Sequence, residues 1–474
     1  MDWINKARIK SSDLIERSLD RNIRIAVTGL SGAGKTAFIT SLINQLLFAS
    51  NEKHLTFFRA NSQRRIKACK LMQHDELHIP SFDYNAAINH LTAEEPEWPM
   101  STKTVTQAQL KSRFTVANRW LRKVQSDSHV TIDVIDYPGE WLLDLPLLSM
   151  DYKEWSQSCC KYLSSERRHK YTNEVFQHIS TLDHQTRKDE LEISNKLSKL
   201  AKEYASSLLE YRKDYNDYAT VLPGRFILPG DLAGAPVLDF FPILNQDILN
   251  LDWSQFDSNS TLAILEKRFN YYKNKIIKPF FHDYFSNVDR QIVLIDTGSA
   301  LEAGYESYQD LKETIEQLLE GFSYGRSNWL KRLFSPTIDK LMIATSKADL
   351  VPPDQHAALE SFMQKMVNQA KNNVDYEGVE VETMAISAIA TSEPISTEHQ
   401  GKRLLCVKGI EQSSGESVIH YPGKVPSRTL SREEWNELNI DFSPFAIPPL
   451  SPDEPLPHIR MDKVIEFLIG DKFI

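Results

Sequence analysis

The segment that most constrains the fold of this 474-residue chain is Gly-Leu-Ser-Gly-Ala-Gly-Lys-Thr at residues 29–36. It fills every fixed position of the phosphate-binding P-loop pattern. Residues 23–28 before it alternate as in a strand, and residues 37–48 after it carry apolar side chains at helical spacing. A strand, a glycine-rich turn and a helix N-terminus together aim backbone N–H groups at phosphate oxygens. The sequence therefore predicts an α/β domain that binds a nucleotide.

Two side chains of this segment have specific predicted roles. Lys35 would reach the β- and γ-phosphates as a point charge, and the Thr36 hydroxyl would hold Mg²⁺. The rest of the turn would contact phosphate mainly through its backbone. These further predicted nucleotide-binding residues are Ser31, Gly32, Ala33, Gly34 and Ala37.

A second motif follows a buried-strand run at residues 130–135, which ends in Asp136-Tyr-Pro-Gly139. The Asp136 carboxylate would reach the metal through water, and the Gly139 N–H would face the γ-phosphate. Glu140 stands where a Gln often orients the attacking water; its carboxylate could orient that water, or point to solvent and leave hydrolysis slow. The predicted catalytic residues are Lys35, Thr36, Asp136, Gly139 and Glu140.

A threonine that contacts Mg²⁺ is expected just before another strand. Residues 108–116 alternate between apolar and polar types, which predicts a strand antiparallel to the one at 130–135. In the small-GTPase arrangement the metal-contacting threonine precedes this strand; we favour Thr102, with Thr104 as the alternative. The predicted metal-binding residues are Thr36, Thr102 and Asp136.

Two further strand ends carry motifs that favour guanine. The strand at 340–345 runs into Ser346-Lys-Ala-Asp349, which differs from the N-K-x-D pattern by Ser for Asn. The Asp349 carboxylate would accept bonds from guanine N1–H and the 2-amino group, which adenine does not offer in that pattern. Because Ser replaces Asn, the support of the base is weaker or rearranged. The predicted base-contacting residues are Ser346, Lys347, Asp349, Ser387, Ala388 and Ile389.

Composition excludes several other classes of function. A net charge of −9 argues against a chain that coats nucleic acid or anionic membrane. The four cysteines form no CxxC pair and no zinc spacing with histidine, as expected in a reducing cytoplasm. No stretch reaches the roughly 18 apolar residues that predict a membrane span. We therefore expect a cytoplasmic protein with no direct membrane insertion.

Two long insertions interrupt the nucleotide-binding motifs. After Ile193, apolar residues recur every three or four positions up to Tyr211, which predicts an amphipathic helix in a helical hairpin or bundle. This stripe is read as core rather than as a partner-binding groove. The predicted parts are an N-terminal helix (1–21), a GTPase-like domain in two segments (22–140 and 289–400), a helical insertion (141–288), a small β-rich, Pro-rich module (401–458) and a returning C-terminal helix (459–474).

The motif order resembles that of TRAFAC-type P-loop GTPases, and the wider sequence resembles the YcjX family of bacterial stress-associated GTP-binding proteins. The segments that carry the resemblance are 29–36, 98–102, 136–141, 222–231 and 467–473. It implies a three-layer P-loop fold that binds GTP or GDP with Mg²⁺ and hydrolyses GTP slowly. It also implies a stress regulon that includes a membrane-protein partner, which would bring the protein to the inner membrane.

Three functions remain open at this point. The leading one is a slow GTPase whose turnover resets a conformation, with the helical insertion as the effector arm. The second is a GTP-binding scaffold without hydrolysis, which Glu140 in place of Gln keeps open. The third is an ATP-dependent ATPase or kinase, against which Asp349 argues, since an ATP site gains nothing from that carboxylate.

Overall fold

The computed structural model describes most of the chain. The described residues are 22–29, 32–51, 53–74, 76–100, 104–117, 126–163, 166–182, 190–215, 223–285, 287–320, 338–376, 378–399 and 401–473. The predicted N-terminal helix (1–21), the P-loop residue Ser31 and the favoured metal-contacting residue Thr102 lie outside these ranges.

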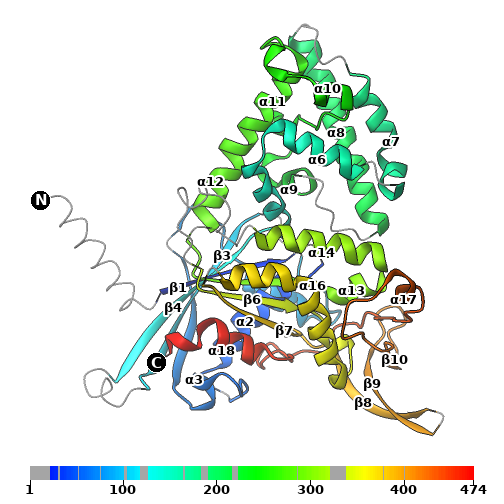
Figure 1. Ribbon diagram of the computed structural model, residues 1–474. Helices are drawn as coiled ribbons and strands as arrows, with labels where there is room; N and C mark the ends of the chain where they lie inside the picture. The colour runs from blue at the N-terminus through cyan, green and yellow to red at the C-terminus, as the bar shows by residue number, and fades with distance from the viewer. Residues whose placement is uncertain are drawn as a thin grey trace, which may run out of the picture.

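A seven-stranded, mostly parallel sheet forms the centre of the molecule, in the order β2-β3-β4-β1-β5-β6-β7 (Figure 1). Its strands are β1 (Asn22–Gly29), β2 (Ile66–Met72), β3 (Thr106–Thr115), β4 (Asp127–Asp136), β5 (Arg290–Ile295), β6 (Lys340–Thr345) and β7 (Glu380–Ala385). In this sheet the β2–β3 and β3–β4 pairs are antiparallel, and the other described pairs are parallel. The antiparallel pairing of β3 with β4 confirms the prediction, and the sheet is that of a P-loop GTPase-like fold.

Helices cover both faces of this sheet, and the alternation of β1 shows why. Ile23, Ile25 and Val27 point to one face, where they pack with α2 (Lys35–Phe48) and α18 (Met461–Ile469). The intervening Ala26 belongs to the core on the other face. That face is covered by α14 (Tyr305–Glu320) and α16 (His356–Tyr376), as Figure 1 shows. Because both faces are buried, the central strands contain continuous apolar runs, such as residues 292–295 of β5 and 341–344 of β6.

The insertion between β4 and β5 is mainly helical and stands above one face of the sheet (Figure 1). It contains η1 (Gly139–Ser149), α6 (Tyr152–Leu163), α7 (Glu166–Ser180), α8 (Glu190–Tyr215), α9 (Gly224–Ile227), η2 (Gly230–Leu232), η3 (Pro236–Leu238), α10 (Gln246–Asn250), η4 (Trp253–Gln255), α11 (Thr261–Tyr272), η5 (Lys273–Ile277), α12 (Lys278–Phe280) and η6 (Phe281–Phe285). In α8, Ile193, Leu197 and Tyr204 are buried, which confirms that the predicted apolar stripe is core. Trp155 of α6 stacks on Phe269 of α11 at 5.2 Å, and these rings hold the helices together.

A three-stranded antiparallel sheet of order β10-β9-β8 forms a separate module. It consists of β8 (Ser392–His399), β9 (Lys402–Ile410) and β10 (Ser417–His420), followed by α17 (Arg432–Asn436). β8 lies before residue 401, where the sequence predicted the β-rich module to start. Since β8 pairs with β9 along its length, the small sheet begins earlier than the pattern indicated.

The chain ends on the central sheet, where α18 and the short turn η9 (Gly470–Lys472) return to the first strands. Arg290, at the start of β5, donates from Nε to the Leu468 carbonyl oxygen at 3.2 Å. Its guanidinium also pairs with Asp471 at 2.8 Å and with Asp339. Arg290 is only 2% exposed, so these contacts compensate the burial of its charge.

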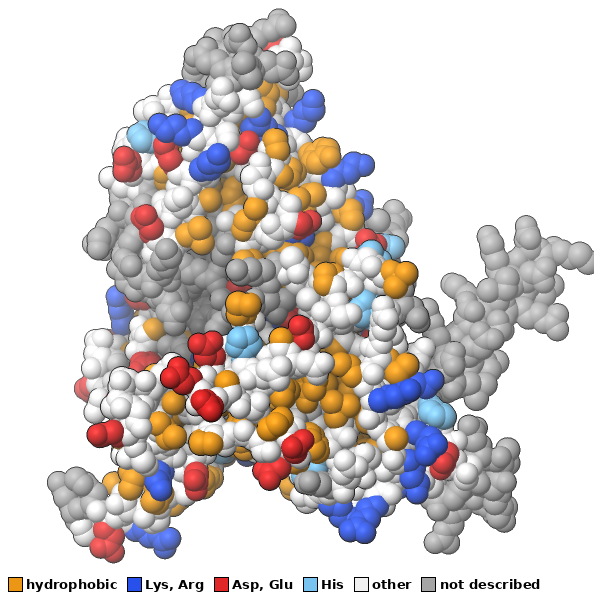
Figure 2. All heavy atoms as spheres, turned by 180° about the vertical axis from the view of Figure 1, so that it is seen from behind, with side chains coloured by type: hydrophobic (Ala, Val, Ile, Leu, Met, Phe, Trp, Pro, Cys, Tyr) orange, Lys and Arg blue, Asp and Glu red, His pale blue; other side chains and the backbone are white. Residues whose placement is uncertain are grey.

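The opposite side of the molecule is shown in Figure 2. On that face acidic and basic side chains are mixed, with apolar side chains exposed between them, as is typical of a protein surface. Within the described part of the chain, no helix combines the length and the apolar character needed to cross a membrane.

Candidate nucleotide-binding site

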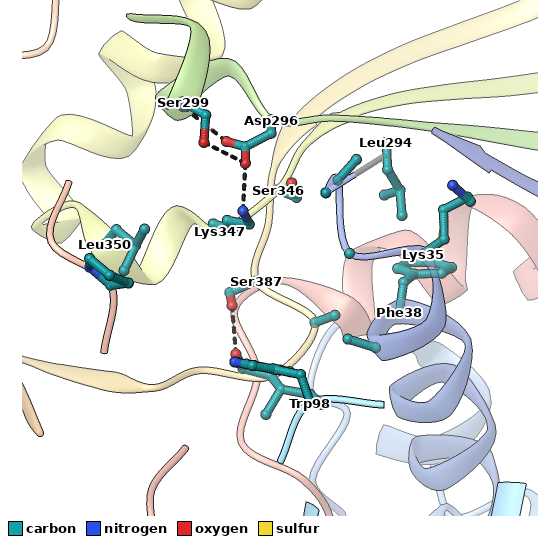
Figure 3. Close-up of a pocket in the computed structure, with 18 of the residues that line it drawn as sticks. Lys35, Phe38, Trp98, Leu294, Asp296, Ser299, Ser346, Lys347, Leu350 and Ser387 are labelled. Atoms are coloured by element: carbon teal, nitrogen blue, oxygen red, sulfur yellow. Dashed lines mark hydrogen bonds and ion pairs between the residues drawn. The ribbon is translucent and has the colours of Figure 1, made fainter. Parts of the chain in front are cut away.

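A cavity with a volume of about 940 Å³ lies beyond the carboxyl ends of β1, β4, β5, β6 and β7. This edge of a parallel sheet is where ligands of such folds bind. The cavity brings together most of the residues predicted from separate motifs, as the close-up in Figure 3 shows for the labelled ones. The predicted residues that line it are Gly32, Ala33, Gly34, Lys35, Thr36, Ala37, Glu140, Ser346, Lys347, Asp349, Ser387, Ala388 and Ile389.

The described part of the P-loop has the backbone that its glycines permit. Gly32 and Gly34 both have φ of +83°, a left-handed conformation that costs little free energy only in glycine. Gly34 precedes the first residue of α2, so the turn leads directly into a helix N-terminus. Lys35 donates from Nζ to the Gly29 carbonyl oxygen at 2.6 Å. Its ammonium group therefore lies at the glycine-rich turn.

The Asp136–Gly139 motif lies directly beside the P-loop. Asp136 ends β4 in register with Val27 of β1 and is 1% exposed. A Cβ atom on Gly139 would overlap the carbonyl oxygen of Gly29, so any other residue would separate the two loops. Glu140 is 5% exposed and lines the cavity, so its carboxyl group does not point to solvent.

The segment before β3 also reaches the P-loop. The Thr36 hydroxyl donates to the carbonyl oxygen of Met100 at 3.3 Å, two residues before Thr102. Thr104 is described and is exposed. Trp98, in the same segment, lines the cavity and is 42% exposed. Sequence reasoning assigned Trp98 no role, since a single Trp in a loop has no spacing that marks a ligand contact.

The two loops predicted to contact the base are hydrogen-bonded to each other and to α2. One carboxylate oxygen of Asp349, Oδ2, accepts bonds from both the backbone N–H and the hydroxyl of Thr391, at 2.8 and 2.7 Å. The Ser41 hydroxyl of α2 donates to the Ala388 carbonyl oxygen at 2.6 Å. Asp349 is thus oriented by a threonine that the motif search missed. The only indication in the sequence was that Thr391 lies four residues after Ser387, in the same loop.

Ser346, the residue that departs from the guanine pattern, faces the neighbouring strand. Its hydroxyl donates to the Ile295 carbonyl oxygen at 3.3 Å, and its backbone N–H donates to the same atom at 2.9 Å. Lys347 reaches across to Asp296 at the end of β5, with 2.5 Å between Nζ and Oδ2. Asp296 is a second cavity residue that the sequence did not reveal.

The helical insertion is joined to the segment after Gly139. A Cβ on Gly224 would overlap the Glu140 carbonyl oxygen, and Trp141 donates from Nε1 to the Leu228 carbonyl oxygen at 3.0 Å. The Arg225 guanidinium lies 3.2 Å from the centre of the Trp141 ring. Leu228 also lines the cavity. The insertion therefore contacts the loop expected to sense the γ-phosphate and forms part of the cavity wall.

The small β-rich module supplies another part of the cavity wall. Its cavity residues are Gln412, Phe442, Pro444 and Phe445. The ring of Phe442 lies close to Gly298, at the start of α13 (Thr297–Glu302). No motif predicted these contacts, because they depend on how the module folds back over the site.

The oxygen donors near the P-loop fit the predicted magnesium. The Thr36 hydroxyl and the Asp136 carboxylate are the hard oxygen ligands that Mg²⁺ prefers. Among the described residues there is no cluster of three or more His, Cys, Asp or Glu side chains that could hold a metal by itself. A magnesium ion bound mainly through phosphate and water needs only one or two protein oxygens, so these residues fit it.

Comparison with known proteins places the chain in a family. The model of the YcjX-like family, DUF463, matches residues 23–473. The chain is 36% identical over 460 residues to the "Ras-like GTPase YcjX" of Escherichia coli (strain K12), covering 97% of each chain. It is 37% identical over 485 residues to the protein of the same name from Shewanella oneidensis (strain MR-1), covering 99% of this chain and 98% of that one. This chain therefore belongs to the YcjX-like family.

Proposed function

We propose that this protein binds GTP, hydrolyses it slowly to GDP with Mg²⁺, and acts as a nucleotide-controlled switch. The observation that carries the proposal is the convergence of the P-loop, Glu140 and the Ser346–Asp349 and Ser387–Ile389 loops on one cavity. The name of the two relatives, "Ras-like GTPase", supports it. As the resemblance implies, the switch would serve a bacterial stress response.

The chemistry proposed for the phosphate end follows from charge and position. Lys35 and the backbone N–H groups of the P-loop would neutralise the charge that builds up on the transferring phosphoryl group. When bound, Mg²⁺ would add a further positive charge to the phosphate oxygens. Thr36 and Asp136 would hold that ion directly and through water, and the Gly139 N–H would face the γ-phosphate.

Glu140 is the residue proposed to orient the attacking water. It is buried at the cavity wall beside Gly139. A carboxylate can accept a proton or a hydrogen bond from water, but its negative charge is repelled by the γ-phosphate. That repulsion is a physical reason for slow turnover. It also defines the alternative, a GTP-binding scaffold in which Glu140 does not support hydrolysis.

The insertion is proposed to carry the response to nucleotide state. Gly224 lies against the Glu140 backbone, and Tyr137 and Trp141 pack edge-on against Phe280 of α12. A shift of the segment that follows Asp136 on loss of the γ-phosphate would therefore press on two parts of the insertion at once. This arrangement would convert a local change at the phosphate into a movement of helices.

The proposal is tested by measuring phosphate release from GTP and from ATP with Mg²⁺. We expect release from GTP, little from ATP, and a loss of about a hundredfold in Lys35→Ala, as for removal of a preorganised charge at a reacting group. Lys202→Ala, at an exposed position of α8, is the matched control and should keep the wild-type rate. Equal rates with GTP and ATP, or full activity in Lys35→Ala, would contradict the proposal.

A further inference from the structure

Ser346 has a shorter side chain than the Asn that the N-K-x-D pattern places at this position, so it can make fewer hydrogen bonds to neighbouring loops. In the N-K-x-D pattern this position is Asn, whose amide both donates and accepts hydrogen bonds. The shorter Ser346 side chain makes its bond to the Ile295 carbonyl oxygen within the adjacent strand. It therefore links β6 only to β5, at the strand ends.

Asp296, one residue beyond Ile295, makes a longer connection. Its Oδ1 accepts a bond from the Ser299 N–H at 3.0 Å, and its Oδ2 accepts from the Ser299 hydroxyl at 2.7 Å and from Lys347 Nζ at 2.5 Å. The residue is 4% exposed. A carboxylate so deeply buried needs a cation or several donors, and here it has both.

The backbone of Lys347 is held in a conformation that directs its side chain toward Asp296. Its φ is +58°, in the left-handed region that non-glycine residues rarely adopt. The next residue fixes this turn, because the Ala348 N–H donates to the Ile386 carbonyl oxygen at 2.9 Å. Figure 3 shows the Lys347 amine directed at Asp296, with both residues at the cavity wall.

We propose that Asp296 is a positioning residue for the nucleoside. The ion pair holds the aliphatic stem of Lys347 in one place, so that the stem forms a fixed apolar surface against the base. The pair also joins the loops that follow β5 and β6, one residue beyond the strand ends that Ser346 links. This inference rests on the proposed binding of a guanine nucleotide, and adds to it a carboxylate that belongs to none of the recognised motifs.

Asp296 has a second structural role, and a substitution can test the ion pair separately from it. The same side chain caps the N-terminus of α13 by accepting the Ser299 N–H. Asn caps helices about as well as Asp does, so Asp296→Asn keeps the cap and removes the charge that Lys347 requires. Ser299→Ala keeps both the cap and the ion pair, and removes only the bond from the Ser299 hydroxyl to the carboxylate.

The test is calorimetric titration of the full chain with GDP and, separately, with pyrophosphate. Asp296→Asn should weaken GDP binding about tenfold, as for a lost charge-assisted hydrogen bond. Pyrophosphate binding should change less than about twofold, because P-loop contacts dominate it. Ser299→Ala should leave both affinities within about threefold of wild type, the effect of one neutral hydrogen bond.

A double variant completes the experiment. Asp296→Asn combined with Lys347→Gln restores a neutral hydrogen-bonding pair, so it should bind GDP no more weakly than the single Asp296→Asn variant. Unchanged GDP binding in Asp296→Asn, or equal losses for GDP and pyrophosphate, would overturn the positioning role while leaving guanine binding intact. A wild-type protein that binds pyrophosphate but not GDP would contradict the proposed function as well.

Discussion

At the scale of the residue, the proposed specificity for guanine depends on how Asp349 is held. Both bonds from Thr391 fall on Oδ2, which leaves Oδ1 for a ligand in the cavity that Asp349 lines. Asp349 is 5% exposed, so an incoming base would compete with little water for that oxygen. A carboxylate in this setting accepts hydrogen bonds and rejects a base that presents an acceptor.

Asp349→Asn should therefore change which base is bound. Asn presents an N–H as well as an oxygen, so it suits xanthine, which carries a carbonyl oxygen where guanine has its 2-amino group. We expect GDP binding to weaken by at least about tenfold and xanthosine diphosphate binding to strengthen, measured by competitive titration. Thr391→Val is the control: it should weaken GDP a few-fold without favouring xanthine. A variant that still prefers GDP would refute this role of Asp349.

The residues of the site that could be predicted are those whose chemistry is fixed by local spacing. Lys35 and Gly139 follow strands at defined offsets, and the cavity brings the P-loop and base motifs together. Thr391, Asp296 and Trp98 escaped prediction because each acts through a loop that meets the site only in three dimensions. A supporting residue has no fixed offset from the side chain that it orients.

At the scale of the element, η1 connects the Gly139 loop to the insertion through Asp144. Asp144 accepts bonds from the Gly224 N–H at 2.5 Å and from the Tyr272 hydroxyl at 2.7 Å. Burial raises the pKa of the Asp144 carboxyl to about 7 from its ordinary 3.8, although both hydrogen bonds and nearby Arg225 lower the pKa. The folded state therefore binds a proton that the unfolded state releases between about pH 4 and pH 7.

Ionisation of Asp144 should lower the free energy of unfolding as the pH rises. Because the folded pKa is raised, ionisation of Asp144 destabilises the protein fully above about pH 7 and not at all below about pH 4. A shift of about three pKa units corresponds to an upper value of about 4 kcal/mol. Asp144→Asn should remove this contribution, so its free energy of unfolding relative to wild type should rise from pH 5 to pH 8. Urea unfolding at the two pH values measures it; a constant difference would contradict the assignment.

Helices and strands could be predicted where apolar residues recur in the sequence with a single period. The buried runs of β4 and β6 and the apolar stripe of α8 indicate their structures directly. The edge strand β2 was not predicted, because its residues do not alternate between apolar and polar types and it carries exposed Lys67 and Lys70. Edge strands commonly carry lysines, which discourage pairing with another chain. The 3₁₀ geometry of η1 has no clear pattern, since its packing against Gly224 sets it.

At the scale of the whole molecule, we predict that the conformation of the helical insertion depends on which nucleotide is bound. We expect tryptic cleavage at exposed lysines of α8, such as Lys196 and Lys199, to differ in rate between the GDP and GTP-analogue states. Gly224→Ala should reduce that difference, because its Cβ would force the loop away from Glu140. Gly234→Ala is the control for backbone strain alone, since its φ is +77° and no atom lies within 4 Å of its Cβ; it should leave the difference between the two nucleotide states unchanged. Identical protection in both nucleotide states would remove the insertion from the switch.

The most direct test of the account is calorimetric titration of the purified protein with GDP, a non-hydrolysable GTP analogue and the matching adenine nucleotides, each with Mg²⁺. The arrangement of Asp349, Thr391 and the Ser387–Ile389 loop predicts that guanine nucleotides bind at least about tenfold more tightly than adenine ones. Equal affinities would mean that the Ser346–Asp349 segment is only the end of a strand, and that the cavity serves an ATPase or kinase.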